Sequence, residues 1–167
     1  MGYTLDQFAA DCKSALKADS GVGGMEACRD FVSKACKDEA FVKEFLPANP
    51  DKERRVIYED PDLGFCICAH VYNDAKQGSP HDHGPTWAIY GQAMGETSMT
   101  DWDIVEPAAG DNPAKVKLGR TYKLVPGDAH VYPVGAVHAP FRDSPTRLIR
   151  IEGKDTLGLK RTKIEQI

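Results

Sequence analysis

The sequence predicts a mainly β protein with a short helical lead, because two stretches of the chain have different residue patterns. Residues 1–46 carry apolar side chains at helical spacing. Over residues 47–153, short runs rich in Val, Ile, Tyr and Phe alternate with turn-forming clusters. No long helical pattern interrupts these runs, which favours a β-sandwich or barrel over parallel βαβ units. Residues 154–167 form a polar tail, and we expect the 167 residues to make one domain.

Three helices are expected in the lead. The first covers residues 4–18, with Thr4 as its N-cap and apolar side chains on one face. The glycine-rich stretch at 21–24 interrupts this pattern, and the second helix is expected over about 25–35. A third, shorter helix is expected over about 38–45, before two prolines stop helix formation.

Strands are expected where β-branched and aromatic residues cluster between turn signals. Asp101 and Asp103 are expected in turns instead, since Asp side chains bond nearby backbone amides. The runs expected as strands are RRVIYE, GFCICAHVY, WAIYGQA, AKVKL, TYKLV, HVYPV and RLIRIEG.

The composition argues against several classes of function. The chain is 41% hydrophobic, has a mean hydropathy of −0.43 and carries a formal net charge of −4. It has no run of Lys and Arg that could follow phosphates, so no nucleic-acid partner is expected. No apolar run reaches about 18 residues, so no membrane span is expected. The N-terminus does not have the pattern of a secretory signal, and we expect a cytoplasmic protein.

The five cysteines fit a reducing compartment, in which they stay free thiols. Cys66 and Cys68 are one residue apart, and in a strand they share a face as small buried groups. A metal role for the pair is not expected, because the spacing is not that of a zinc knuckle.

Two of the five histidines stand in the stretch SPHDHGPTW, at residues 79–87. Alternate residues of an extended segment point the same way, so His81 and His83 can converge on one point. Asp82 then points away and can hold the loop, and Gly84 favours a turn. Two imidazoles so placed suit a first-row metal ion, although an HxH pair alone is equally typical of a surface loop.

A second segment, PGDAHVYPVGAVHAP, has a regular spacing of its own. Gly127 is followed after five residues by Pro133, and Gly135 is followed after two residues by His138. A turn glycine thus begins a strand, a Pro-x-Gly turn ends it, and a histidine follows.

Together the two segments resemble the two-part signature of the cupin superfamily, over roughly residues 55–152. The first part of that signature is a glycine, HxH, a glutamate and a later glycine, which Gly91 matches. The second part has the spacing of the second segment. The resemblance implies a jelly roll, or double-stranded β-helix barrel. It also implies that His81, His83 and His138 bind one divalent metal ion.

The glutamate of that signature has no counterpart here. Its position falls at Trp87 or Ala88, neither of which can bind a metal, and Glu96 lies too far along the chain. Among cupins, three imidazoles without a carboxylate resemble the thiol dioxygenases, of which cysteine dioxygenase is the best known. The resemblance implies iron(II), with O₂ and a small molecule such as a thiol-bearing carboxylic acid as substrates. Zinc, nickel and manganese also accept imidazole ligands.

An arginine is expected to hold the substrate carboxylate. In the thiol dioxygenases this residue lies on an early strand upstream of HxH, and Arg55 fits that place. A guanidinium there would bind a carboxylate through two hydrogen bonds. The alternative is that Arg54 and Arg55 form a solvated strand edge.

One late-strand feature of cysteine dioxygenase has no match. The mammalian type carries a Ser-x-His-x-Tyr segment there, whereas this chain has no His or Tyr after His138. The corresponding stretch, TRLIRIEG, places Arg150 and Glu152 on one face of a strand. They either replace the missing groups or form an ion pair on the outer face. The outer face is expected, because exposed charges are common.

Further candidates flank the third histidine. His130 and Tyr132 alternate on the strand before His138, so we expect both to face the cavity as catalytic candidates. For His130, the role of a packed and hydrogen-bonded side chain is more common than that of a metal ligand. His70 can line the same pocket, or be a satisfied barrel histidine.

The predicted function is therefore an iron(II) dioxygenase that acts on a small organic substrate. One alternative is a non-oxidative cupin, a lyase or isomerase that uses zinc, nickel or manganese and needs no O₂. The other is a small-molecule-binding module without catalysis. Oxygen consumption separates the first alternative from the prediction, and a turnover assay tests the second. A homodimer, through a barrel face or the helical lead, is one expected assembly.

Overall fold

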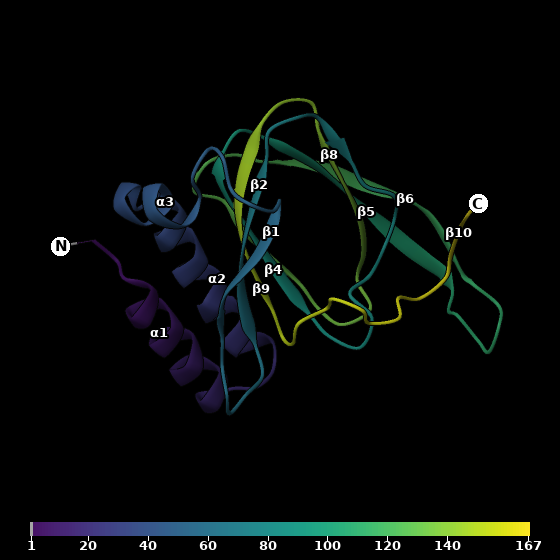
Figure 1. Ribbon diagram of the computed structural model, residues 1–167. Helices are drawn as coiled ribbons and strands as arrows, with labels where there is room; N and C mark the ends of the chain where they lie inside the picture. The colour runs from purple at the N-terminus through teal and green to yellow at the C-terminus, as the bar shows by residue number, and fades with distance from the viewer. Residues whose placement is uncertain (1) are drawn as a thin grey trace.

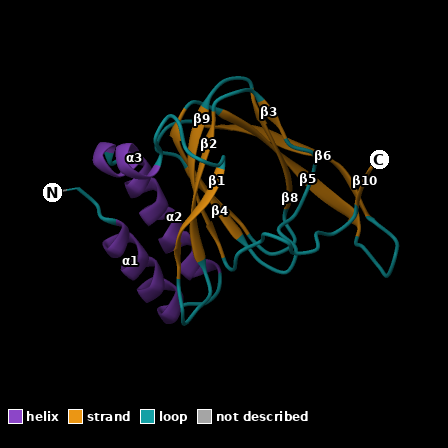
Figure 2. Cartoon of the chain, in the orientation of Figure 1, coloured by secondary structure: helices purple, strands orange, loops and turns teal. Residues whose placement is uncertain are grey.

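The computed structural model describes residues 2–167 as three helices followed by ten strands (Figure 1, Figure 2). The helices are α1 (Leu5–Ala18), α2 (Val22–Lys37) and α3 (Glu39–Phe45). The strands are β1 (Arg54–Glu59), β2 (Cys66–Tyr72), β3 (Lys76–Gln77), β4 (Ala88–Met94), β5 (Thr97–Glu106), β6 (Ala114–Leu124), β7 (Ala129–Tyr132), β8 (Val137–Arg142), β9 (Thr146–Glu152) and β10 (Ile164–Gln166).

Local hydrogen bonds explain where the helices begin. Thr4 caps α1 as predicted, because its hydroxyl accepts from Gln7 N and the Gln7 side chain bonds back to Thr4 N. The expected break between the first two helices is present, but it covers residues 19–21 rather than 21–24, since α1 ends at Ala18 and α2 begins at Val22. A Cβ on Gly24 would lie 1.8 Å from Asp19 O, so glycine here permits the close turn between α1 and α2.

The strands form two five-stranded sheets that roll into a barrel. Their orders are β1-β2-β9-β4-β7 and β10-β6-β5-β8-β3. From β4 onward the chain crosses repeatedly between the two sheets, since β4, β7 and β9 lie in the first while β5, β6 and β8 lie in the second. This alternation is that of a jelly roll, so the predicted mainly β barrel with a helical lead is confirmed.

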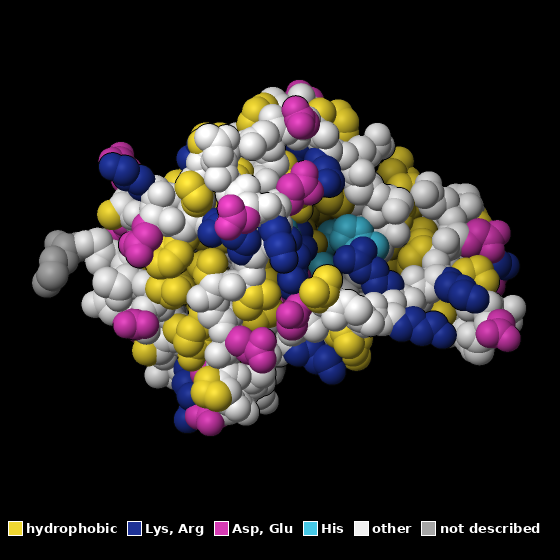
Figure 3. Space-filling view, viewed as in Figure 1, with side chains coloured by type: hydrophobic (Ala, Val, Ile, Leu, Met, Phe, Trp, Pro, Cys, Tyr) yellow, Lys and Arg dark blue, Asp and Glu magenta, His cyan; other side chains and the backbone are white. Residues whose placement is uncertain are grey.

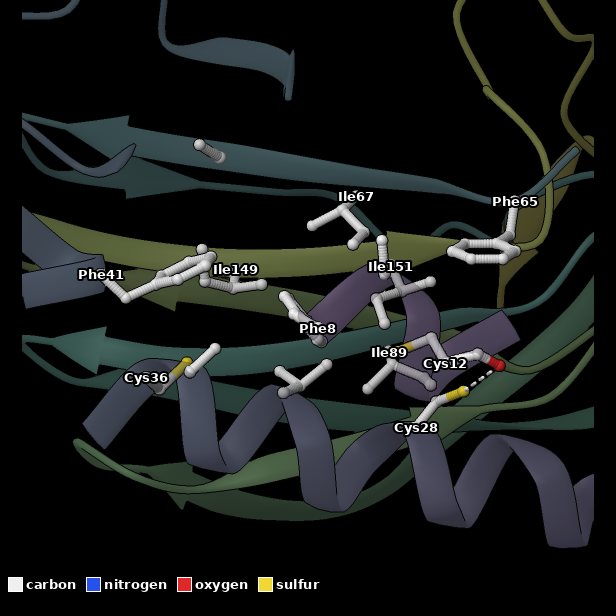
Figure 4. Close-up of a cluster of buried hydrophobic side chains, with 14 of the residues drawn as sticks. Phe8, Cys12, Cys28, Cys36, Phe41, Phe65, Ile67, Ile89, Ile149 and Ile151 are labelled. Carbon is white, nitrogen blue, oxygen red and sulfur yellow. Dashed lines mark hydrogen bonds between the residues drawn. The ribbon is translucent and has the colours of Figure 1, made fainter. Parts of the chain in front are cut away.

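The helices pack on the outer face of the first sheet (Figure 1, Figure 2). Alternate residues of β2, β4 and β9 supply that face, with Ile67, Ile89, Ile149 and Ile151 fully buried against the helices. Figure 4 shows these isoleucines among the buried side chains of α1, α2 and α3. The opposite residues of the same strands therefore point into the barrel, where they can form a site.

Gly91 allows α2 to approach β4 closely. A Cβ at this position would lie 2.2 Å from Val32 Cγ1 and 2.8 Å from Cys36 Sγ. Only a residue without a side chain fits between the sheet and the helix, which gives the closing glycine of the sequence signature a packing role.

The second sheet departs most from the sequence prediction. β5 includes Asp101 and Asp103, so the expectation that they form turns is wrong. Asp101 is held in the strand by Arg120 and Tyr122 of the paired β6, which donate to its carboxylate at 3.0 Å each. β6 is one continuous strand rather than two, and β8 was not expected as a strand.

The polar tail is not separate from the barrel. Its β10 pairs in parallel with β6, so residues beyond 153 extend the second sheet. None of the three helices described is long and apolar enough to cross a bilayer.

Candidate metal centre

The structure brings His81, His83 and His138 together inside the barrel. His81 and His138 form an antiparallel bridge, in which each backbone N–H donates to the other residue's carbonyl at 3.0 Å. His83 lies two residues further on the same side of the chain. Its Nε2 lies 3.3 Å from Nε2 of His138, and one ring nitrogen from each of the three lies within 4.8 Å of the others.

The loop that carries the HxH pair is held by Asp82. This side chain is almost fully buried and accepts from Gly84 N at 3.0 Å. The Thr162 hydroxyl and backbone N–H of the C-terminal segment donate to the same carboxylate. Asp82 thus points away from the two histidines, as expected, and ties their loop to the end of the chain.

All three imidazoles are neutral at neutral pH. Burial lowers the pKa of His81 to about 4 and that of His83 to about 2, with the charge of Arg150 adding to the effect on both. Burial also holds the pKa of His138 well below its usual range, assisted by His81 and His83. The neutral imidazole is the form that binds a metal ion.

The tautomer of His81 follows from one hydrogen bond. Its Nδ1 lies 2.8 Å from the carbonyl oxygen of Ser79, which can only accept, so Nδ1 carries the proton. Nε2 of His81 then has a free lone pair. A backbone carbonyl that orients a ring in this way is typical of metal-binding histidines, and the donor set fits a divalent first-row ion.

Tyr90 is the functional candidate that the sequence analysis missed. It lies on β4 two residues after Ala88, and its register with β7 and β9 points it into the barrel. Its hydroxyl lies 2.9 Å from His83 Nε2 and 3.2 Å from His138 Nε2. Sequence periodicity predicts that every second residue of this strand points into the barrel. It does not tell whether that set includes Tyr90 or its neighbours Ile89 and Gly91.

Arg150 and Glu152 lie inside the barrel, so the expected ion pair on the outer face is wrong. Glu152 is fully buried, and Arg150 Nη1 lies 3.6 Å from its Oε1. The Arg150 guanidinium also covers the ring of Tyr90, with Cζ 4.0 Å from the ring centre. The Nε of Arg150 is buried without a hydrogen-bond partner. A buried cation with an unpaired donor is suited to an anionic ligand.

The structure does not place Arg55 in this site. Arg55 pairs with Ala69, on the face of the first sheet that the helices cover, and its guanidinium donates to the carbonyl of Phe45. The expected contact with a substrate carboxylate is therefore not compatible with its position. Arg54 faces inward instead, and its Nη2 lies 3.0 Å from Glu152 Oε2.

The two candidates on β7 lie at different depths. The ring centre of Tyr132 lies 4.1 Å from that of His138, so Tyr132 borders the three histidines. Its hydroxyl lies 2.7 Å from that of Tyr122. His130 stacks on Tyr122 with ring centres 5.1 Å apart, which leaves the ring of Tyr132 between His130 and His138. His130 is therefore placed as a packed aromatic rather than a ligand.

His70 lies deeper in the barrel. It is buried, and its Nδ1 lies 3.0 Å from the hydroxyl of Tyr72. Its Nε2 is buried without a partner. Burial and the nearby charges of Arg150 and Arg54 hold its pKa well below the usual range, so this imidazole is neutral.

Cys66 and Cys68 form a second group of potential ligands with Glu152. The two sulfurs lie 3.7 Å apart, and Cys66 Sγ lies 3.9 Å from Glu152 Oε2. Both Arg54 and Arg150 lie within ion-pair distance of this carboxylate, and they would repel a metal ion there. The neighbouring Cys68 thiol and burial raise the pKa of Cys66, so it keeps its proton. The three histidines are therefore the better candidate.

Histidine side chains reach the surface of the barrel in the space-filling view. Several Lys and Arg side chains border them, and Asp and Glu side chains lie nearby on the same face (Figure 3). His81 is the partly exposed member of the three, so this is where the barrel interior meets solvent. The basic side chains that border the histidines favour an anionic ligand.

Comparison with known proteins finds similarity to solved structures alone. No family model matches the chain, and no curated protein matches it. It is similar to KdgF from Halomonas sp., with 19% identity, coverage of 59% of this chain and 76% of that one, and a TM-score of 0.44. A cupin superfamily protein from Desulfitobacterium hafniense has 16% identity, coverage of 65% and 83%, and a TM-score of 0.47. A cupin-2 domain containing protein from Shewanella frigidimarina has 18% identity, coverage of 66% and 89%, and a TM-score of 0.47. At these identities a likeness concerns the fold alone.

Proposed function

We propose that this protein is a metal-dependent cupin enzyme, an iron(II) dioxygenase that acts on a small thiol-bearing carboxylic acid. The observation that carries the proposal is the meeting of three neutral imidazoles beside a buried arginine. Imidazoles alone suit several metals, but a ligand set without a carboxylate, next to a cationic wall, favours an anionic substrate at the metal.

His81, His83 and His138 would hold the ion. Bound iron(II) supplies the activation of O₂, for which three protein nitrogens leave coordination positions free. The protein's own contribution is a fixed arrangement of donors. The bridge between His81 and His138 and the buried Asp82 hold the rings in place without the ion, so little reorganisation is needed when it binds.

Arg150 takes the role that the sequence analysis gave to Arg55. Its guanidinium lies over the ring of Tyr90, and the hydroxyl of that ring contacts His83 and His138. Its unpaired Nε can donate to a substrate carboxylate. Because the Arg150 side chain is only 12% exposed, that charge-assisted bond would orient the substrate strongly.

The experiment measures oxygen uptake by protein loaded with iron(II) under argon and then exposed to a panel of short thiol carboxylates. Each acid is paired with its amide, which keeps the thiol but lacks the negative charge. We expect oxygen uptake with at least one acid and little with its amide. Absence of oxygen uptake across the panel would contradict the proposal. Turnover without O₂ on zinc, nickel or manganese would favour a lyase or isomerase, and tight binding without turnover would favour a binding module.

A further inference from the structure

The hydroxyl of Tyr90 occupies a place where a metal ligand is expected. It lies 2.9 Å from His83 Nε2 and 3.2 Å from His138 Nε2, and those two nitrogens are 3.3 Å apart. Donors that share one ion at about 2.1 Å lie about 3.0 Å apart in cis-octahedral and about 3.4 Å apart in tetrahedral geometry. The three atoms therefore have the mutual separations of ligands on one ion.

From this geometry we infer that Tyr90 is a fourth protein ligand, and that its phenolate oxygen joins His81, His83 and His138 on the metal. The inference rests on the proposed metal centre and adds a ligand to it. On binding, the hydroxyl proton leaves to solvent and the oxygen lone pair enters the coordination sphere, so no oxidant or other reactant is needed.

Arg150 offsets part of the cost of placing an anionic oxygen at Tyr90. Burial raises the pKa of Tyr90, whereas the guanidinium of Arg150, with Cζ 4.0 Å from the ring centre, favours the phenolate. Tyr132 packs against the same ring at 5.0 Å and fixes its orientation. Tyr90 is fully buried, and its hydroxyl contacts both His83 and His138.

A fourth ligand limits how a substrate can bind. An octahedral ion with four protein donors keeps two positions, one for O₂ and one for a single substrate atom. A thiol acid would then contact the ion through sulfur alone, and its carboxylate would remain available to Arg150.

Spectroscopy tests the ligand without an activity assay. Apoprotein of the full chain is titrated with iron(III), and resonance Raman spectra are recorded in any visible charge-transfer band. We expect a band with phenolate ring modes in the wild type and no such band in Tyr90→Phe. Zinc affinity, measured by calorimetry, should fall at least about tenfold in Tyr90→Phe. That is the smaller of the losses seen when a residue that only hydrogen-bonds to a metal ligand is removed.

Tyr132→Phe is the matched control, because Tyr132 borders His138 but its hydroxyl contacts Tyr122. It should keep the phenolate band. A wild type that binds zinc in a His138-dependent way but shows no phenolate modes overturns the fourth ligand and leaves the metal centre standing. Loss of the band in Tyr132→Phe instead of Tyr90→Phe also overturns it. No zinc or iron binding at all contradicts the proposed function itself. The wild-type spectrum decides the question even if Tyr90→Phe fails to fold.

Discussion

The guanidinium of Arg150 lies over the ring of Tyr90, whose hydroxyl contacts both His83 and His138. One aromatic side chain thus separates the charged group that can bind a carboxylate from the nitrogens that can bind a metal. A substrate held by both ends would lie across the edge of this ring.

Replacing Arg150 should weaken the binding of acidic substrates. We expect Arg150→Met to raise KM for a thiol carboxylate by about 10- to 100-fold, because a hydrogen bond to a charged group contributes about 1.5–3 kcal/mol. Steady-state oxygen uptake measures the effect. Arg55→Met is the matched control, since Arg55 contacts Phe45 on the other face of the sheet. A similar rise of KM in both variants would show that Arg150 acts through stability rather than substrate contact.

The buried carboxylate of Glu152 should be important for stability. It is fully buried and bonded to Arg54 at 3.0 Å and to the Thr156 hydroxyl at 2.9 Å. Glu152→Ala leaves Arg150 without a carboxylate partner and Arg54 with Asp155 alone, and we expect it to cost about 3–5 kcal/mol in the free energy of unfolding. Urea denaturation provides the measurement. Glu106→Ala, which breaks the exposed pair with Lys115, should cost less than about 1 kcal/mol. Equal losses would argue against a dry barrel interior.

Asp60 should make stability depend on acid pH. Burial alone would raise its pKa, but hydrogen bonds from Leu63 N and the Tyr58 hydroxyl, with the ion pair to Lys13, lower the pKa to about 2. The unfolded value is about 3.9. Because the folded pKa is the lower one, the stabilisation is fully present above about pH 4 and is lost as the pH falls toward 2.

Unfolding of Asp60→Asn tests this dependence. At pH 7 the variant should be less stable than the wild type by about 1–3 kcal/mol, and the difference should be smaller at pH 3. Asp62→Asn is the control, because Asp62 also pairs with Lys13 but its side chain is 61% exposed. A difference between Asp60→Asn and wild type that stays constant from pH 7 to pH 3 would contradict the assignment.

The contact between Gly91 and α2 should tolerate no side chain. We expect Gly91→Ala to cost about 1–3 kcal/mol, because its methyl group would overlap Val32 Cγ1. Thermal denaturation measures the loss. The double variant with Val32→Ala should recover part of it, since the overlapping atom is then absent. Strictly additive losses would indicate that the two positions do not touch.

The histidine positions were predictable because they depend on local spacing. His81 and His83 need only an extended backbone to point the same way, and the glycine and proline turns before His138 determine where its strand starts. By contrast, β1 shows little alternation of burial, since Arg54 and Arg55 are both half-buried. Only the register with β2 shows which of the two faces inward, and register is set by contacts that are distant in sequence.

The buried charges were the least predictable part of the site. Arg150 and Glu152 are charged residues of the kind usually found on a solvated strand. The partner of Glu152 is Arg54, which lies 98 residues earlier in the sequence. The same reasoning failed for Asp101, which bonds Arg120 and Tyr122 across a strand pair. In each case a polar side chain is satisfied by a partner that only the closed barrel supplies.

The link from Thr162 to Asp82 makes the last residues of the sequence part of the support for the histidine loop. A chain shortened after β9 would keep all three imidazoles. It would lose the hydrogen bonds from Thr162 that hold the loop carrying His81 and His83. For the same reason, removing residues 154–167 should weaken metal retention even where β1 to β9 stay folded.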